Sequence, residues 1–263
     1  MTYILAATVI LLRDTSAGPE ILMIERGEKL AFAGGALVFP GGRVDPADVV
    51  TARDPTLATG FDTLDDRDAA ARVACCREAL EETGVLLTAG AAPDPVALAN
   101  ARARLAAGSD SDEASSFAAM LAALDHRVDS ARFMPFARWE PPAAAPIKRR
   151  FDTDFYIADA GNAASAAISP DGHEAVAIRW TTATAVLTAE AEGRAALVFP
   201  TKCNLQRLAQ YDSVAAIFSA VAARPAPFVQ PEIVKRDGAM WITIAAGCDY
   251  PVLGEPIDGV RRE

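Results

Sequence analysis

The stretch VACCREALEETGVLL, residues 73–87, places three glutamates on one face of an expected helix. Glu78, Glu81 and Glu82 stand at positions i, i+3 and i+4, so their side chains point in nearly the same direction. Like charges at this spacing destabilise an isolated helix by about 0.2–0.5 kcal/mol per pair. Asp68 is a suitable N-cap and Gly84 a suitable C′ residue. The pattern predicts a helix over residues 68–82 whose carboxylates serve a purpose other than helix stability.

The residues around these glutamates argue against a merely solvated helix face. Charge runs usually mark such faces, but five fixed residues here match R-E-x-x-E-E-x-G: Arg77, Glu78, Glu81, Glu82 and Gly84. At roughly one in twenty per position, chance produces this match about once in three million windows. Clustered carboxylates are hard oxygen ligands for Mg²⁺ or Mn²⁺, which bridge phosphate oxygens during displacement at phosphorus. The cluster indicates metal-dependent chemistry on a phosphate compound.

The glycine pair of GALVFPGG, which ends at Gly42, supplies a second part of this site. Glycine lets the backbone turn tightly and approach a cation, where a main-chain carbonyl serves as a ligand. We expect Glu78 and Glu82 to bind the cation, aided by Glu81 and the Gly42 carbonyl. Repulsion within the cluster raises carboxylate pKa values, which leaves one carboxylate able to act as a base. Arg77 can orient a carboxylate and offset part of the repulsion.

Together the two motifs resemble the Nudix box, G-x5-E-x7-R-E-U-x-E-E-x-G-U, in which U is apolar. The second half matches from Arg77 to Val85, with Ala79 in the apolar position. The first half departs from the box, because Arg77 follows Gly42 by 35 positions instead of 14, an insertion of about 21 residues. Counting back from Arg77, the first glutamate of the box falls at Ala69. The resemblance therefore covers the metal helix more closely than the loop before it.

Three segments, GALVFPGGRVDPAD, RVACCREALEETGVLL and RRFDTDFYIA, resemble the Nudix subgroup of peroxisomal and mitochondrial coenzyme A diphosphatase-like proteins, from about Ile4 to about Leu208. The resemblance implies an α/β (α+β) fold, an α/β/α sandwich around a mixed sheet. It also implies a hydrolase that uses Mg²⁺ or Mn²⁺ to cleave the diphosphate bond of a nucleoside-diphosphate-linked small molecule. Coenzyme A or an acyl derivative is the expected substrate. The alternatives are ADP-ribose, nucleotide sugars or dinucleotides, or a non-catalytic Nudix-fold ligand-binding protein, against which the intact glutamate set argues.

The catalytic candidates implied by the resemblance are Glu81, Arg77 and Glu78. A water is expected to attack one phosphorus while Glu81, or less favourably Glu174, takes its proton. Glu174 as a plain strand-edge carboxylate is the simpler interpretation.

The substrate-binding candidates are Arg150 and Arg26. Arginine binds phosphate through two parallel hydrogen bonds, and Arg150 in IKRRFDTDFY stands at a strand start, where a solvated basic end explains it equally well. In the motif of bacterial coenzyme A pyrophosphatases, Gly35 is present at the expected distance before the glycine pair. The arginine expected four residues earlier is Ala31, and Arg26 is the candidate replacement.

The remaining chain predicts one domain over residues 1–263. Strands are expected in YILAATVILL, PEILMIER, GGALVFPGG, RRFDTDFYIADA and HEAVAIRW, and a hairpin in EIVKRDGAMWITI with its turn at Asp237-Gly238. Helices are expected at about 183–197 and 204–223. Residues 43–67 read as an irregular loop insert and residues 91–130 as a helical insert. We expect the two inserts to wall a pocket for a large leaving group, although core cover or a homodimer contact is the alternative.

Composition limits the partners. The net charge of −10 offers no basic surface for nucleic acid. The apolar N-terminal run is about ten residues, where roughly twenty are needed to span a membrane, so no membrane association is expected. Four cysteines without metal or disulfide spacing suit a reducing, cytoplasmic location. Asp152 and Asp154 read as structural, and His126 and His173 are not expected to bind a metal because neither has a cysteine or a second histidine nearby in the sequence.

Overall fold

A computed structural model describes residues 3–27, 35–107, 116–143, 145, 149–161, 168–171 and 175–257. Its centre is an eight-stranded sheet in the order β10-β7-β8-β1-β2-β3, with β4 paired to β1 and β9 paired to β2. Strand β1 (Ile4–Thr15) runs parallel to β8 (Phe151–Asp159) and antiparallel to β2 (Gly18–Arg26). The sheet is mixed, as the resemblance implied.

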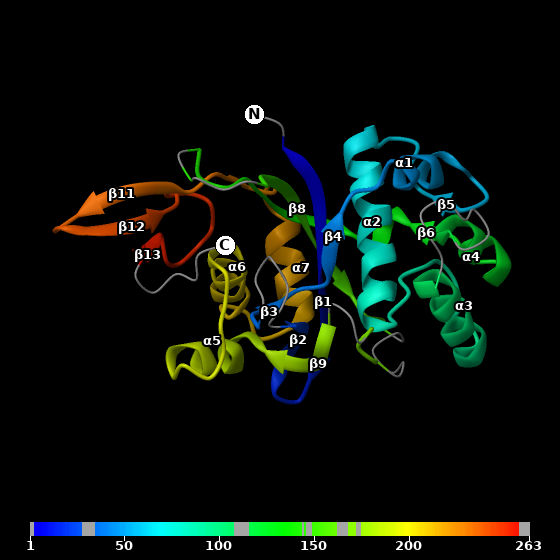
Figure 1. Cartoon of the computed structure of the whole chain (residues 1–263), viewed down its shortest axis with the longest axis horizontal. Helices are drawn as coiled ribbons and strands as arrows, with labels where there is room; N and C mark the ends of the chain where they lie inside the picture. Colours follow the sequence, from blue (N-terminus) through cyan, green and yellow to red (C-terminus); the bar gives the residue numbers. More distant parts are fainter. Residues whose placement is uncertain are drawn as a thin grey trace.

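Helices cover both faces of this sheet (Figure 1). Successive side chains of a strand point to opposite faces, and both faces of β1 are buried. Val9 packs on the side of helix α2 (Asp66–Thr83), whereas Ile10 packs on the side of helices α6 (Phe199–Leu208) and α7 (Val214–Ala222). These two clusters form the expected α/β/α sandwich.

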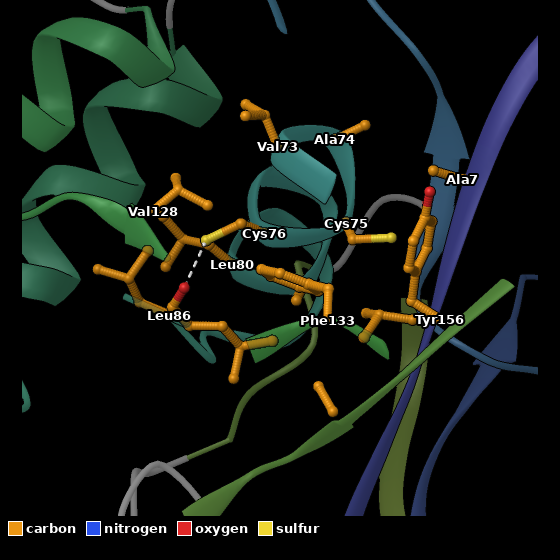
Figure 2. Close-up of a cluster of buried hydrophobic side chains, with 14 of the residues drawn as sticks. Ala7, Val73, Ala74, Cys75, Cys76, Leu80, Leu86, Val128, Phe133 and Tyr156 are labelled. Atoms are coloured by element: carbon orange, nitrogen blue, oxygen red, sulfur yellow. Dashed lines mark hydrogen bonds between the residues drawn. The ribbon is translucent and has the colours of Figure 1, made fainter. Parts of the chain in front are cut away.

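Small side chains allow α2 to lie close to the sheet. Cys75 points toward Tyr156 of β8, and Cys76 points toward Val128 on the other side of the helix (Figure 2). The thiol of Cys76 also donates a hydrogen bond to the Leu87 carbonyl at 3.3 Å. Both cysteines therefore act as small core residues, and all four cysteines of the chain are free thiols.

Helix α2 begins earlier than the sequence predicted. Asp65 is the N-cap, and its carboxylate accepts a hydrogen bond from the Asp68 N–H. Asp68 itself lies in the first turn, where it pairs with Arg72 and accepts from the Tyr156 hydroxyl. The prediction of Asp68 as the N-cap was wrong. Either aspartate could start the helix on local grounds, and the contact with Tyr156 holds the Asp68 side chain in the first turn, where it does not act as the cap. Gly84 ends the helix as predicted, with φ 80°.

The first insert is not an irregular loop, which corrects the prediction for residues 43–67. It contains helix α1 (Pro46–Arg53) and strand β5 (Ala58–Thr59). A capping box starts α1, in which the Asp48 carboxylate accepts a hydrogen bond from the Asp45 N–H at 2.8 Å. Asp45 and Pro46 are the N-cap and the first residue of this helix, a position at which proline is favoured.

The second insert, residues 91–130, contains helices α3 (Pro95–Ala107) and α4 (Phe117–Leu124). Its end is extended instead of helical, because β6 (Val128–Asp129) pairs in parallel with β5 of the first insert. A short 3-10 turn, Ser130–Arg132, follows. The two inserts are therefore joined to each other on the α2 side of the sheet (Figure 1).

The remaining elements follow the predicted order with three differences. The strand expected in GGALVFPGG is two short strands, which pair with β2 and β1 respectively. Strand β7 (Met134–Trp139) was not predicted, and it lies between β8 and β10 in the sheet. The expected helices at 183–197 and 204–223 are three helices, because α6 begins early and a break at 209–213 separates it from α7. The other elements of this part are β3 (Leu37–Val38), β4 (Gly41–Arg43), β9 (Ala175–Thr182) and α5 (Ala183–Ala191).

The C-terminal part adds β10 (Phe228–Val229) and a separate small sheet. The predicted hairpin is confirmed: β11 (Glu232–Arg236) and β12 (Ala239–Thr243) join at Asp237 and Gly238, both with positive φ. Strand β13 (Gly254–Pro256) pairs with β12. Ile242 and Tyr250 anchor this sheet in the α6 cluster. Across the described ranges, no helix combines the length and apolarity needed to cross a bilayer.

Candidate active site

The last turns of α2 lie against β4, which pairing with β1 holds in the sheet. The Gly41 N–H donates a hydrogen bond to the Glu82 carboxylate at 2.9 Å, and Glu82 is only 4% exposed. A Cβ at Gly42 would overlap the carboxylate of Glu78. Only glycine lets that carboxylate lie directly on the backbone. The structure thus brings Glu78 and Glu82 together beside the glycine turn, the arrangement on which the metal hypothesis depends.

Arg77 is the centre of the site's ion pairs. Its Nη1 donates to Glu78 at 2.8 Å and to Glu81 at 3.2 Å. Its Nη2 donates to the Arg43 carbonyl of β4 at 2.9 Å. One guanidinium therefore joins two carboxylates of the helix to the strand opposite, which is the orienting contact predicted for Arg77.

Asp48 is a site residue that the sequence reasoning missed. Its two carboxylate oxygens accept from Nε and Nη2 of Arg77, each at 3.1 Å, and the residue is 2% exposed. The signal was present: Asp48 stands six positions after Gly42, the G-x5-E spacing with aspartate for glutamate. Counting back from Arg77 pointed instead to Ala69, which is a fully buried core residue. The inserted residues therefore follow this acidic position instead of preceding it.

Burial dominates the electrostatics of the cluster. Burial raises the pKa of Glu81 to about 7, and the nearby charge of Glu78 adds to this rise, although Arg77 opposes it. Burial likewise raises the pKa of Asp48 above its usual value despite the bonds to Arg77. Glu81 is the most exposed carboxylate paired with Arg77, at 33%. A half-open carboxyl with a pKa near neutrality can take and release a proton under physiological conditions.

The donor set fits a hard divalent cation. Glu78, Glu81 and Glu82 offer carboxylate oxygens beside the Gly42 backbone, and oxygen ligands are what Mg²⁺ and Mn²⁺ prefer. Among the residues that the structure describes, no three His, Cys, Asp or Glu side chains are already gathered to hold a metal ion. The carboxylates instead bond to Arg77 and the Gly41 N–H. Cation binding would exchange some of these partners for the ion.

The two arginines predicted to bind substrate lie in different settings. Arg150 is 6% exposed, and its guanidinium donates to the carbonyls of Pro141, Pro142 and Ala145. These contacts give it a role in holding the turn before β8 and do not support phosphate binding. Arg26 ends β2, and its backbone pairs with residues 35 and 36 beside a segment outside the described residues. Substrate binding by either arginine stays a prediction.

Other weighed residues have structural partners. Asp152 and Asp154 form ion pairs with Arg67, and Asp152 also pairs with Arg138, in agreement with the structural interpretation. The Nδ1 atom of His126 lies 2.9 Å from the Thr88 hydroxyl. The candidates Glu174 and His173 lie outside the described residues.

One open hollow of about 400 Å³ lies elsewhere, between the end of α5 and the start of β3. Its lining includes Gly35, Glu190, Arg194 and Leu197, and none of the glutamates of α2. The candidate site is therefore a surface of α2 and β4 and is separate from this hollow.

Residues 52–208, more than half of the chain, match the NUDT19 Nudix domain family. The chain belongs to the Nudix hydrolase family. The match includes all of α2 and begins after the glycine pair, so the geometry at Gly41 and Gly42 supports it independently. As a Nudix hydrolase, the protein is a diphosphate-bond hydrolase.

The fold agrees with that of a solved NUDIX hydrolase. The crystal structure of a NUDIX hydrolase from Alicyclobacillus acidocaldarius is 27% identical, with a TM-score of 0.66, over 83% of this chain and 96% of that chain. A MutT NUDIX hydrolase from Burkholderia pseudomallei is 17% identical, with a TM-score of 0.41, over 78% and 97%. The NUDIX domain of Shewanella oneidensis NrtR, solved in complex with ADP ribose, is 12% identical, with a TM-score of 0.41, over 76% and 82%. The last two are too distant to carry an argument about fold or substrate.

Proposed function

We propose that this Nudix hydrolase uses Mg²⁺ or Mn²⁺ to cleave the diphosphate bond of coenzyme A or an acyl-coenzyme A. The observation that carries the proposal is the end of α2, where Glu78 and Glu81 pair with Arg77 and Glu82 accepts from the Gly41 N–H, all beside the Gly42 backbone. A non-catalytic binding protein would have no use for three carboxylates held at this cost in repulsion.

In this proposal, Glu78, Glu82, Glu81 and the Gly42 carbonyl would hold the cation. When bound, the cation offsets the charge that develops on the phosphate oxygens during displacement. Arg77 orients Glu78 and Glu81 through its two hydrogen bonds. Glu81, the most exposed of the carboxylates paired with Arg77, would take the proton of the attacking water.

Asp48 acts on the reaction only through Arg77. Buried and hydrogen-bonded to both Nε and Nη2 of Arg77, it holds the guanidinium in one orientation. The same side chain caps α1, so the first insert and the reacting carboxylates share one buried contact.

The choice of coenzyme A rests on the subgroup resemblance and on the two inserts. The first insert begins directly at the end of β4, and the second follows α2 after a short connection. The two inserts are joined to each other by β5 and β6 and lie on the α2 side of the sheet. Loops and insertions carry specificity on a rigid scaffold. We infer that they form a wall for a leaving group longer than a single sugar, such as a pantetheine arm. A cytoplasmic location and a homodimer stay predictions.

The test is a substrate screen with Mg²⁺ and Mn²⁺, with products identified by mass, on the wild type and the Glu82→Gln variant. Glutamine preserves the shape of Glu82 and can still accept from the Gly41 N–H, so the fold should persist. Turnover should fall by about 100-fold or more because a ligand charge is lost. Glu232→Gln, on the exposed strand β11, is the matched control. Unchanged turnover in Glu82→Gln would overturn the metal assignment.

The substrate is decided by the same screen. Coenzyme A should yield phosphopantetheine and adenosine 3′,5′-bisphosphate faster than ADP-ribose yields AMP and ribose 5-phosphate. Much faster hydrolysis of ADP-ribose would refute the choice of coenzyme A and leave the diphosphatase chemistry intact.

A further inference from the structure

The C-terminal end of α2 carries the reacting carboxylates but has an unfavourable local composition. The last carbonyls of any helix have no partner within it, and its negative dipole end disfavours nearby anions. The last turn of α2 contains Glu81 and Glu82 and no basic residue. Gly84 closes the turn by donating its N–H to the Leu80 carbonyl at 2.9 Å. The carbonyls that follow must be satisfied from elsewhere in the fold.

Arg102 of α3 supplies that partner. Its Nε and Nη2 donate to the Glu81 carbonyl at 3.2 and 2.8 Å. The same guanidinium donates to the hydroxyl of Ser169 at 2.7 Å and to its carbonyl at 2.9 Å. The N–H of Ser169 in turn donates to the Thr83 carbonyl at 3.2 Å. One cation thus joins the helical insert, the end of α2 and the segment at 168–171.

The contact of Arg102 matters for the position of α3 because few other contacts hold this helix against the rest of the protein. No residue of α3 is fully buried, and Leu98, Ala101 and Leu105 pack only partly against the α2 cluster. Charged donors form stronger hydrogen bonds than neutral ones, and a planar guanidinium can bond two groups in a fixed relative orientation. Arg102 is therefore suited to set the position of the turn that contains Glu81.

We propose that Arg102 is a positioning residue of the active site: it makes the helical insert an external cap for α2 and clamps residues 168–171 beside the catalytic turn. The structural part of this proposal stands on the hydrogen bonds alone. Its kinetic part rests on the proposed function, because it needs a substrate that the enzyme turns over.

The structural part of the proposal is tested by amide hydrogen exchange on Arg102→Met, because methionine keeps an apolar side chain and removes the guanidinium. Arg104→Met, on the exposed side of the same helix, is the matched control. Exchange should rise about tenfold or more in peptides covering residues 79–86 and 168–171 of Arg102→Met, as expected for local opening. Peptides from β1 and β8 should not change, and the control should match the wild type. Unchanged exchange at both sites in Arg102→Met would overturn the clamp.

The kinetic arm uses the best substrate from the screen. Misplacing a catalytic group by about 1 Å can cost up to about 100-fold in rate, so kcat of Arg102→Met should fall at least tenfold with KM nearly unchanged. Added guanidinium should restore part of the rate of Arg102→Ala. A raised KM with normal kcat would mean that Arg102 binds substrate, which overturns the positioning role. If the wild type turns over no nucleotide, the proposed function fails while hydrogen exchange still decides the clamp.

Discussion

Glu81 is expected to destabilise the metal-free protein at neutral and alkaline pH. Its pKa is raised from 4.5 to about 7 by burial and by Glu78. The folded state therefore binds this proton more tightly than the unfolded state does. That contribution to stability is fully present below about pH 4.5 and is lost as the pH rises through about 7. Replacing Glu81 with glutamine removes the titration, so Glu81→Gln should be more stable than the wild type at pH 8.

The size of the gain follows from the pKa change and the exposure of the side chain. A rise from 4.5 to about 7 corresponds to at most about 3 kcal/mol of lost stability at pH 8. The Glu81 side chain is 33% exposed and bonds Arg77 at 3.2 Å, so solvent screening and the lost ion pair reduce the expected gain to about 1–2 kcal/mol. For a chain of this size, that is a rise in Tm of about 3–6 °C.

The assay is thermal unfolding in a chelator at pH 8 and at pH 4.5, with Glu232→Gln as the control. Glu81→Gln should gain stability at pH 8 and little or none at pH 4.5. Added Mg²⁺ should stabilise the wild type more than the variant, because a cation that binds only the folded state raises its stability. The variant should also lose turnover. Equal or lower stability of Glu81→Gln at pH 8, or a gain independent of pH, would refute the reasoning.

Three further substitutions separate stability from catalysis. Gly42→Ala places a methyl group against the flexible Glu78 carboxylate, so kcat should fall about tenfold or more. The free energy of unfolding in urea should change by less than about 1 kcal/mol. An unchanged kcat would contradict the close contact between Gly42 and Glu78. Gly41→Ala places its Cβ 2.5 Å from the Ala7 carbonyl oxygen, so the free energy of unfolding in urea should fall by about 1–3 kcal/mol. An unchanged free energy of unfolding would rule out a close backbone contact at Gly41. Asp48→Asn removes the charge that faces Arg77, so kcat should fall about tenfold and stability by about 1–3 kcal/mol. If steady-state kinetics and unfolding of Asp48→Asn match the wild type, Asp48 does not hold Arg77.

Local signals in the sequence were sufficient for several elements. Gly84 ends α2 and Asp237-Gly238 turns the hairpin because a positive φ is needed at each position, and that requirement depends only on neighbouring residues. The apolar run of β1 likewise predicts a buried strand, and both faces of that strand lie in the core. The spacing of Glu78, Glu81 and Glu82 determined that they share one helical face.

The wrong predictions concern segments for which the local sequence allows two different structures. Asp65 and Asp68 are equally good caps, and the contacts of the Asp68 side chain with Arg72 and Tyr156 separate them. Polar, turn-rich composition suggested a loop where Asp48 completes a capping box. For Arg150 the solvated strand end was one of two interpretations, and the structure contradicts it because the side chain is buried and donates to the carbonyls of Pro141, Pro142 and Ala145.

The sequence by itself determined the helix, its carboxylate face and the class of chemistry, because these depend on residue identity and on spacing within a few turns. Only the tertiary structure decided what surrounds that face. Asp48 reaches Arg77 across 29 positions, and Arg102 reaches the Glu81 carbonyl across 21. These contacts depend on the path of the two inserts, which are joined through β5 and β6. Hydrogen bonds between segments far apart in the sequence form only when packing of the core brings those segments together. No local sequence pattern predicts which distant segments will meet.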